Sequence, residues 1–532
     1  MGTRMVYLLQ QLVADAADHD PDQLALVCRG SRLTYGELEQ RSNALAHALI
    51  ERGVERGDRV GVFANKSVET GVAMYGIMAA GGAYVPLDPT SPASRLAYVI
   101  QDCGIQHVIA ENRQRATIAS LERLCVKLDT VIGLTDADIS YPAMGWTEIE
   151  SRGEAPRRRV LEQDLCYVLY TSGSTGVPKG IMHTHRSALS WANVTASEYS
   201  IGDDDVLSNY APIHFDLSTL DFFGGAKGRA TVVMIPEEHM KLSASLASVL
   251  EQSQITLFYT VPLALVQLST PGVLDRGDFS SLKRILFGGE PMPLKHLHSL
   301  MRMLPETRFF NVYGPTEVNG VTHYEVPGPP PVHGDALPIG LPYDNVEALV
   351  LDEEDRPVPQ TKVGELAIRS ATSMRGYWGR PDLNERAFYF RDRFDGLPEV
   401  FHRTGDLVHQ DRDGVLHFHG RKDRQIKSRG YRVELDEVEA VLITHTDVVE
   451  AAVYGVPTQD GTTEIRAAVT LARASAATPS SLRTYLAEKL PGYAVPTVLT
   501  VVEDFPRTPT GKVDRRRIAE ATTALSTSGE RS

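Results

Sequence analysis

The chain has 532 residues, of which 42% are apolar and 23% charged, and it carries a formal net charge of −14. This composition is typical of a globular protein, and the length predicts more than one domain. The acidic balance, without a long basic block, disfavours nucleic acids and anionic membranes as general partners.

Cysteine usage and the apolar pattern predict a soluble cytoplasmic protein. The four cysteines, Cys28, Cys103, Cys125 and Cys166, are widely spaced and form no zinc-binding pattern, so we expect reduced thiols. Residues 1–15 lack the regions of a signal peptide, and no apolar run reaches the roughly 20 residues that span a bilayer.

Helical and strand patterns alternate along most of the chain. Apolar spacing predicts helices at 38–52, 68–80 and 242–252, and strands at 60–64, 165–169 and 255–259. Strands that alternate with helices predict an α/β protein with layered, largely parallel sheets.

Polar, glycine- and proline-containing segments at 151–159, 326–331 and 420–424 are predicted to be connectors. A helical pattern at 435–443, a strand at 451–456 and a helix at 481–490 follow the last connector. These elements predict a compact C-terminal unit of about 100 residues.

A glycine- and hydroxyl-rich loop follows the apolar strand at 165–169. Glycines let a backbone bring its N–H groups against a ligand, while hydroxyls add donors and lysine adds a positive charge, which suits a polyphosphate. Lys179 follows Pro178, so the loop is not a Walker A motif, and an ordinary flexible turn is the alternative interpretation. The candidate phosphate-binding residues are Thr171, Ser172, Gly173, Ser174, Thr175, Gly176 and Lys179.

Together with this loop, the segments 33–38 (LTYGEL) and 82–89 (GAYVPLDP) resemble successive motifs of the adenylate-forming superfamily, in particular the amino-acid adenylation domains of nonribosomal peptide synthesis. The resemblance covers residues 33–515. It implies a large N-terminal domain of layered α/β subdomains (1–422), a small mobile α+β lid (423–520) and a flexible tail (521–532), with ATP and Mg²⁺ as cofactors.

The segment 311–317 (NVYGPTE) resembles the adenine and magnesium motif of this family. The resemblance implies that Tyr313 and Gly314 lie at the adenine, that Thr316 contacts the α-phosphate and that Glu317 binds Mg²⁺. A carboxylate is a suitable ligand for this hard cation. The alternative is a β-turn with a surface glutamate.

Three further residues are assigned by the same resemblance. Asp406 is expected to accept hydrogen bonds from the ribose hydroxyls, with Arg421 beside it. Lys512, in the segment 509–515 (PTGKVDR), is expected to bridge the substrate carboxylate and the phosphate. One cation between two anionic reactants stabilises their transition state.

The resemblance also places a hinge at Asp423, about which the lid turns between two half-reactions. After that rotation, Lys427 is expected to enter the catalytic site, and Gly430 to leave space for a pantetheine tunnel. Without the resemblance, a solvated charged loop is the preferred interpretation of Asp423 and Lys427.

Asp216, in the segment 213–218 (IHFDLS), separates amino-acid-activating members from their acyl- and aryl-acid relatives, because it is expected to pair with the substrate ammonium. A helix N-cap is the alternative role. The pocket is expected to contain no charged side chain besides Asp216. Its predicted lining comprises Phe215, Leu217, Leu220, Tyr259 or Thr260, Leu286, Gly288, Val312, Gly320 and Val321.

This lining is similar to that of stand-alone prolyl-activating enzymes and favours an apolar amino acid, with L-proline as the leading hypothesis. The chain shows no carrier-protein attachment motif after Lys512, so a separate phosphopantetheine carrier protein is the expected partner. The alternatives are an acyl- or aryl-CoA ligase on the same fold and a non-catalytic nucleotide-binding scaffold.

Overall fold

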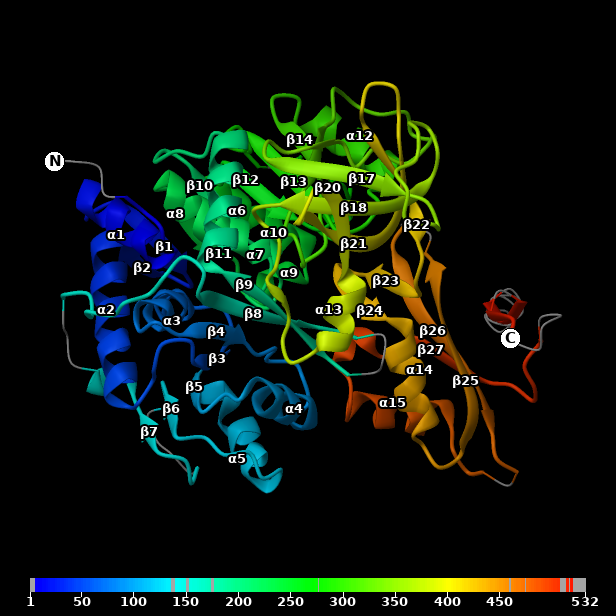
Figure 1. The fold of residues 1–532 in the computed structure, drawn as a ribbon, viewed down its shortest axis with the longest axis horizontal. Coiled ribbons are helices and arrows are strands. Elements are labelled where there is room, and N and C mark those ends of the chain that lie inside the picture. The colour runs from blue at the N-terminus through cyan, green and yellow to red at the C-terminus, as the bar shows by residue number, and fades with distance from the viewer. Residues whose placement is uncertain are drawn as a thin grey trace. The chain divides into compact units, whose positions relative to one another are not determined.

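The computed structural model describes residues 5–134, 139–149, 153–173, 177–275, 277–458, 461–473, 475–507, 513–515 and 517–519 (Figure 1). The chain forms two compact units. The first comprises residues 1–89, 99–170 and 180–422, and the second comprises 90–98, 171–179 and 423–532.

Within the described residues, the first unit has a nine-stranded sheet in the order β16-β15-β14-β13-β12-β10-β11-β1-β2. Its central strands, from β14 to β1, are parallel, so their carboxyl ends lie along one edge. The strands are β1 (Leu24–Cys28), β2 (Ser31–Thr34), β10 (Val206–Asn209), β11 (Thr231–Met234), β12 (Leu257–Thr260), β13 (Arg284–Gly288), β14 (Arg308–Tyr313), β15 (Thr322–Glu325) and β16 (Leu341–Pro342).

An eight-stranded sheet, again counted over the described part of the chain, has the order β19-β9-β8-β4-β3-β5-β6-β7. The strands are β3 (Arg59–Phe63), β4 (Ala83–Pro86), β5 (His107–Ala110), β6 (Thr130–Ile132), β7 (Ala143–Met144), β8 (Leu165–Thr171), β9 (Lys179–Thr184) and β19 (Gly376–Tyr377). A smaller antiparallel sheet is built around the long strand β21, which pairs with β18, β20 and β22. That sheet contains β17 (Val346–Leu351), β18 (Gly364–Ser370), β20 (Phe388–Phe394), β21 (Leu397–Gln410) and β22 (Leu416–Arg421).

Helices pack on the two large sheets, and Figure 1 shows α2 and α3 side by side beside the N-terminal strands. The helices are α1 (Gln10–His19), α2 (Tyr35–Glu51), α3 (Val68–Ala79), α4 (Ala93–Cys103), α5 (Arg115–Arg123), α6 (His185–Glu198), α7 (Leu217–Thr219), α8 (Gly225–Gly228), α9 (Glu237–Met240), α10 (Ser243–Gln252), α11 (Pro262–Leu268), α12 (Leu294–Met303) and α13 (Pro381–Ala387). A π-helical turn, η3 (Leu220–Gly224), links α7 to α8.

The second unit has its own apolar core, formed by α14, α15 and the strands beside them. Its elements are β23 (Gln425–Ser428), β24 (Tyr431–Glu434), α14 (Leu435–Ile443), β25 (Val448–Pro457), β26 (Thr463–Leu471), α15 (Pro479–Ala487) and β27 (Val498–Val501). This mixture of helices and mainly antiparallel strands is an α+β arrangement.

The elements predicted from apolar spacing are present, with boundaries that shift by a few residues. The helix predicted at 38–52 begins earlier, at Tyr35, because Thr34 and Glu37 form a capping box that satisfies the first backbone N–H groups. The connector predicted at 420–424 begins later than expected, because Arg421 still pairs with Asp406 in the sheet.

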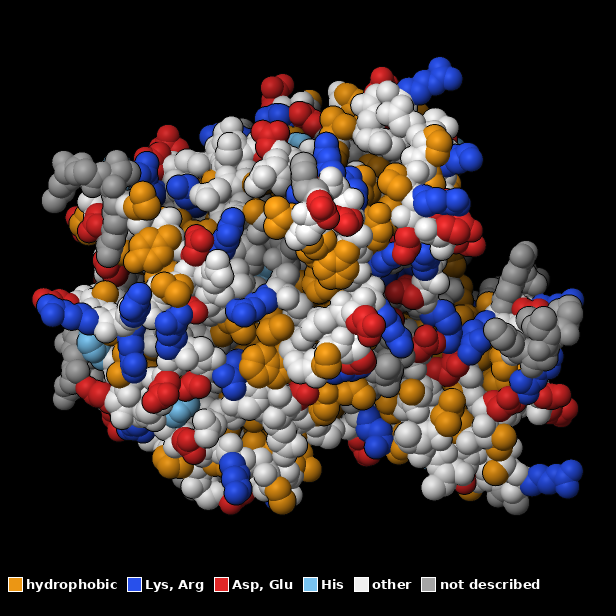
Figure 2. Space-filling view, in the orientation of Figure 1, with side chains coloured by type: hydrophobic (Ala, Val, Ile, Leu, Met, Phe, Trp, Pro, Cys, Tyr) orange, Lys and Arg blue, Asp and Glu red, His pale blue; other side chains and the backbone are white. Residues whose placement is uncertain are grey.

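Charged side chains of both signs are interspersed on the face shown in Figure 2. None of the described helices is long and apolar enough to cross a membrane.

Candidate active site

The glycine loop joins β8 to β9. Thr171 ends the first strand and Lys179 begins the second. A Cβ atom on Gly173 would lie 2.1 Å from the carbonyl oxygen of Val177, so only glycine fits where the loop folds back. Ser172 is buried, and its hydroxyl donates to the Arg432 carbonyl at 3.0 Å. Ser174, Thr175, Gly176 and Lys512 lie outside the described residues.

The residues predicted for adenine and ribose lie together in the first unit. Asp406 and Arg421 face each other across β21 and β22. The Tyr313 hydroxyl donates to one Asp406 oxygen and the Arg421 guanidinium donates to the other, each at 2.5 Å. Burial, and then the charge of Asp406, raise the pKa of Tyr313 well above its ordinary value. A carboxylate oxygen can accept more than one hydrogen bond, which is the property that binding of a ribose diol requires.

The chain turns sharply after β14 and then buries Glu317. A Cβ atom on Gly314 would lie 1.7 Å from the Asn319 carbonyl oxygen, which makes glycine necessary in this turn. Glu317 is only 1% exposed, and its carboxylate accepts a hydrogen bond from the Tyr377 hydroxyl at 2.9 Å. The alternative of a surface glutamate is therefore wrong.

Thr316, the residue before Glu317, is held by a buried histidine. His183 Nε2 lies 2.9 Å from the Thr316 carbonyl oxygen, and a carbonyl only accepts, so Nε2 carries the proton. Burial lowers the pKa of His183 to about 4, against the opposing effects of the Thr316 hydrogen bond and the Glu317 charge. A neutral His183 thus fixes the backbone that presents the Thr316 and Glu317 side chains.

The donor set at this turn fits Mg²⁺ bound with a nucleotide. Within the described ranges, no group of three or more His, Cys, Asp or Glu side chains is arranged to hold a metal by itself. Mg²⁺ commonly takes one or two protein carboxylates and completes its shell with phosphates and water. Glu317 would supply such a carboxylate, and the metal would neutralise phosphate charge.

Five predicted pocket residues belong to one apolar cluster. Side chains alternate along β12, β13 and β14, so every second residue faces the same side. Tyr259, Leu286 and Val312 face this cluster. Phe258, Ile285 and Phe287 face another core. The alternation places Thr260 on the face of Phe258, which favours Tyr259 in the open choice between the two. The cluster also takes in Leu220 and, at its margin, Leu217.

Asp216 stands at the start of α7, beside this cluster. It occupies the N-cap position, but its side chain makes no capping hydrogen bond to the helix. Burial raises the pKa of Tyr259 well above its ordinary value, and the Asp216 charge is the next contributor. The Asp216 charge therefore acts on Tyr259, one of the predicted pocket residues.

Buried polar contacts anchor the π-helical turn that carries Leu220. The Asn209 amide donates to the Asp221 carboxylate at 3.0 Å, and the Lys66 ammonium donates to the carbonyls of Asn209 and Ile235, each at 3.0 Å. Burial lowers the pKa of Lys66 to about 8 and raises that of Asp221. π-Helical turns are frequent at functional sites because they re-aim side chains within a helix.

Other predicted pocket residues take different positions. Val321 packs in a separate cluster around β18 and β21, not in the cluster of Tyr259. Gly288 lies against β14, where an added Cβ atom would approach the Val312 carbonyl oxygen to 2.2 Å. Phe215 directly precedes Asp216, with its ring edge-on to His214 at 5.3 Å. Gly320 lies against a tryptophan ring.

Asp423, Lys427 and Gly430 belong to the second unit, which begins at Asp423 in this part of the chain. Asp423 accepts a hydrogen bond from the Gln425 backbone at 3.2 Å. Lys427 lies on β23. Arg429 and Gly430 form the two-residue turn to β24, with φ of 54° and 85°. Gly430 thus has a backbone reason to be glycine, independent of any tunnel.

Sequence reasoning missed several residues that support the site. His183 and Tyr377 lie 133 and 60 residues from the turn residues that they contact. Trp191 and Tyr343 reach the pocket cluster from α6 and from a loop after β16. No local pattern singles out such residues, because each acts through a contact with a distant part of the chain.

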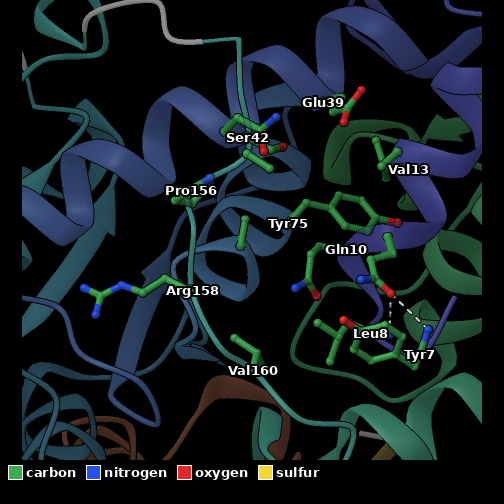
Figure 3. Close-up of a pocket in the computed structure, with 15 residues that line it drawn as sticks. Tyr7, Leu8, Gln10, Val13, Glu39, Ser42, Tyr75, Pro156, Arg158 and Val160 are labelled. Carbon is green, nitrogen blue, oxygen red and sulfur yellow. Dashed lines mark hydrogen bonds between the residues drawn. The ribbon is translucent and has the colours of Figure 1, made fainter. Parts of the chain in front are cut away.

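A cavity of about 180 Å³ lies elsewhere in the first unit, among α1, α2, α3 and the segment 155–160 (Figure 3). It is lined by Leu8, Ser42, Tyr75 and Arg158, among others. None of the predicted site residues lines this cavity, so it is separate from the motifs described above.

Comparison with known proteins assigns the family. Residues 13–378 match the AMP-binding enzymes and residues 437–512 match their C-terminal domain. The chain therefore belongs to the AMP-binding enzyme family, whose members form adenylates from ATP. This confirms the predicted family resemblance, the enzyme class and the α/β fold with a large N-terminal and a small C-terminal domain.

One relative of similar length is an L-proline--[L-prolyl-carrier protein] ligase from Streptomyces coelicolor, 35% identical over 91% of each chain. Tyrocidine synthase 2 from Brevibacillus parabrevis is 33% identical over 96% of this chain, which spans only 14% of that protein. Tyrocidine synthase 1 from the same organism is 31% identical over 96% of this chain and 45% of its own length. The amide bond synthetase McbA from Marinactinospora thermotolerans superposes with a TM-score of 0.84 at 27% identity, over 96% of this chain and 99% of its own.

Proposed function

We propose that this enzyme activates an amino acid, with L-proline as the leading candidate, as aminoacyl-AMP and transfers it to the phosphopantetheine thiol of a separate carrier protein. The observation that carries this proposal is the carboxylate of Asp216 beside an apolar cluster that contains Leu220, Tyr259 and Leu286. The 35% identity to a prolyl-carrier protein ligase supports the choice of proline and of a carrier.

In the first half-reaction, a carboxylate oxygen of the amino acid attacks the α-phosphorus of ATP, and the bond to the pyrophosphate oxygen breaks. Asp216 holds the substrate ammonium. Tyr313, Asp406 and Arg421 bind the adenosine, and the glycine loop binds the leaving phosphates. Mg²⁺, when bound beside Glu317, supplies positive charge. Positioning and electrostatic stabilisation then provide most of the rate, as in other phosphoryl transfers.

In the second half-reaction, the carrier thiol attacks the aminoacyl carbonyl and AMP leaves. We assign this step to a rotation of the second unit about Asp423, which removes Lys512 and brings in Lys427. The change from the first half-reaction to the second would then require only that the second unit take a new position.

The decisive test is amino-acid-dependent ATP–pyrophosphate exchange across the proteinogenic amino acids, with Mg²⁺ and without carrier. A dominant proline signal supports the whole proposal. A dominant signal from another amino acid removes proline but retains adenylation. Exchange only with a non-amino acid, together with thioester formation on free coenzyme A, would establish an acyl- or aryl-CoA ligase instead.

A second test separates the half-reactions. Lys512→Ala should reduce pyrophosphate exchange by a large factor yet retain thioester formation from supplied aminoacyl-AMP. Equal loss in both assays would refute the rotation mechanism. Lys489→Ala, a lysine on the same unit outside the predicted site, is the matched control and should retain both activities.

A further inference from the structure

Trp191 enters the pocket cluster from α6, a helix to which the sequence assigned no site residue. It is 2% exposed, and its ring stands edge-on to Tyr343 with ring centroids 6.0 Å apart. Its cluster is the one that contains Leu220, Tyr259 and Leu286. The indole is therefore part of the same apolar cluster as the predicted pocket residues.

Gly320 lies against the six-membered part of this ring. A Cβ atom added to Gly320 would fall 2.2 Å from Cη2 and 2.7 Å from Cζ3 of Trp191. Contacts below 3.0 Å force one partner to move, and the rigid bicyclic ring has no flexible end that could give way. The space that a side chain at position 320 would need is already filled by Trp191.

The indole N–H of Trp191 has no hydrogen-bond partner among the described residues. Packing alone therefore holds the ring in place, so replacing it changes shape without removing a polar contact. A smaller side chain at position 191 would open space beside Gly320, within the cluster that contains Tyr259.

We propose that Trp191, seated on Gly320, forms a wall of the amino-acid pocket and restricts it to small apolar substrates. This inference rests on the proposed function and deepens it. Gly320 acts as a positioning residue, because it leaves room for the indole rather than for the substrate. Trp191 is the specificity-determining group, and it excludes branched and aromatic side chains that are larger than proline.

The test compares wild type, Trp191→Ala, Trp191→Phe, Gly320→Ala and the double variant Gly320→Ala/Trp191→Ala. The readout is the ratio of kcat/KM for phenylalanine to that for proline in pyrophosphate exchange. Trp191→Ala should raise this ratio at least tenfold, and Trp191→Phe should raise it less. Gly320→Ala should lower activity in the wild-type background. In the Trp191→Ala background it should have little effect, because the added methyl group no longer meets the indole ring.

A matched control is Trp146→Phe, a partly buried tryptophan packed against a different core. It should lower stability without changing the ratio. An unchanged ratio in both Trp191 variants, with equal loss for both amino acids, would overturn the inference. If Trp191→Ala does not fold, Trp191→Phe and the Gly320 variants decide the question. A wild-type enzyme that exchanges with no amino acid would instead overturn the proposed function on which this inference rests.

Discussion

Asp216 shows how one side chain acquires a role from its surroundings. Its position at the start of α7 would fit a helix cap, but its carboxylate makes no capping bond and instead acts on the buried Tyr259. The sequence analysis preferred a role in ammonium binding and kept the helix cap as the alternative. The structure decides against the capping role, and it packs Leu217 of α7 against the cluster that contains Tyr259.

Asp216→Asn should reduce kcat/KM for the amino acid by roughly 100-fold, because loss of one partner of a buried charge pair costs about 2–5 kcal/mol. The KM for ATP should change little. Steady-state pyrophosphate exchange at saturating ATP measures the effect. Equal activity of wild type and variant toward proline would show that Asp216 does not hold the ammonium.

A hydrogen-bonded group is formed by Tyr313, Asp406 and Arg421. Tyr313→Phe keeps the ring but removes the hydroxyl that bonds Asp406, and should raise the KM for ATP about tenfold, since a hydrogen bond to a charged group contributes ~1.5–3 kcal/mol. Asp406→Asn should raise it further, because Arg421 loses its counter-charge. ATP titrations at saturating amino acid test both. A larger effect on the amino-acid KM than on the ATP KM would contradict the adenosine assignment.

At the scale of elements, alternation of side chains along strands decides which predicted residues meet. Leu286 and Val312 share a face with Tyr259 because the strands are in parallel register, and Phe258 faces the other way. Apolar spacing predicted a strand at 255–259, which corresponds to β12, but it gave no prediction for β13 or β14. It could not predict that Val321 would pack elsewhere, because that depends on the chain turning at Gly314.

The β23–β24 hairpin gives a prediction about Gly430. Its φ of 85° favours glycine, so Gly430→Ala should destabilise the protein by about 1–2 kcal/mol. Arg429→Asn, at φ of 54°, should stabilise it by a few tenths of a kcal/mol, because asparagine tolerates this region. Thermal unfolding of both variants measures the difference. Unchanged stability of Gly430→Ala, with loss of thioester formation alone, would favour a purely functional role in a tunnel.

At the scale of the whole molecule, buried histidines should make stability depend on acid pH. Burial lowers the pKa values of His183 and His185 from 6.5 to about 4. The unfolded chain therefore binds more protons than the folded one between these values, so stability falls as the pH drops from 6.5 to 4. Each histidine contributes roughly 3 kcal/mol at most to this loss.

Chemical unfolding measured from about pH 7 to about pH 4 tests this expectation. His185→Asn should flatten the curve in that window, whereas His333→Asn, at an exposed position, should leave its slope unchanged. If the free energy of unfolding of the wild type does not change between pH 6.5 and about pH 4, neither buried histidine opposes protonation.

The sequence by itself determined the family, the α/β class and the order of the motifs, because these follow from local spacing and from residue types in a fixed succession. It also predicted an adenosine site at Tyr313, Asp406 and Arg421, which lie in separate motifs and which the structure brings into contact. Only the tertiary structure decided which side chains support the other predicted site residues. Trp191, His183 and Tyr377 act through packing and hydrogen bonds between distant segments, and such contacts leave no periodic signal in a single chain.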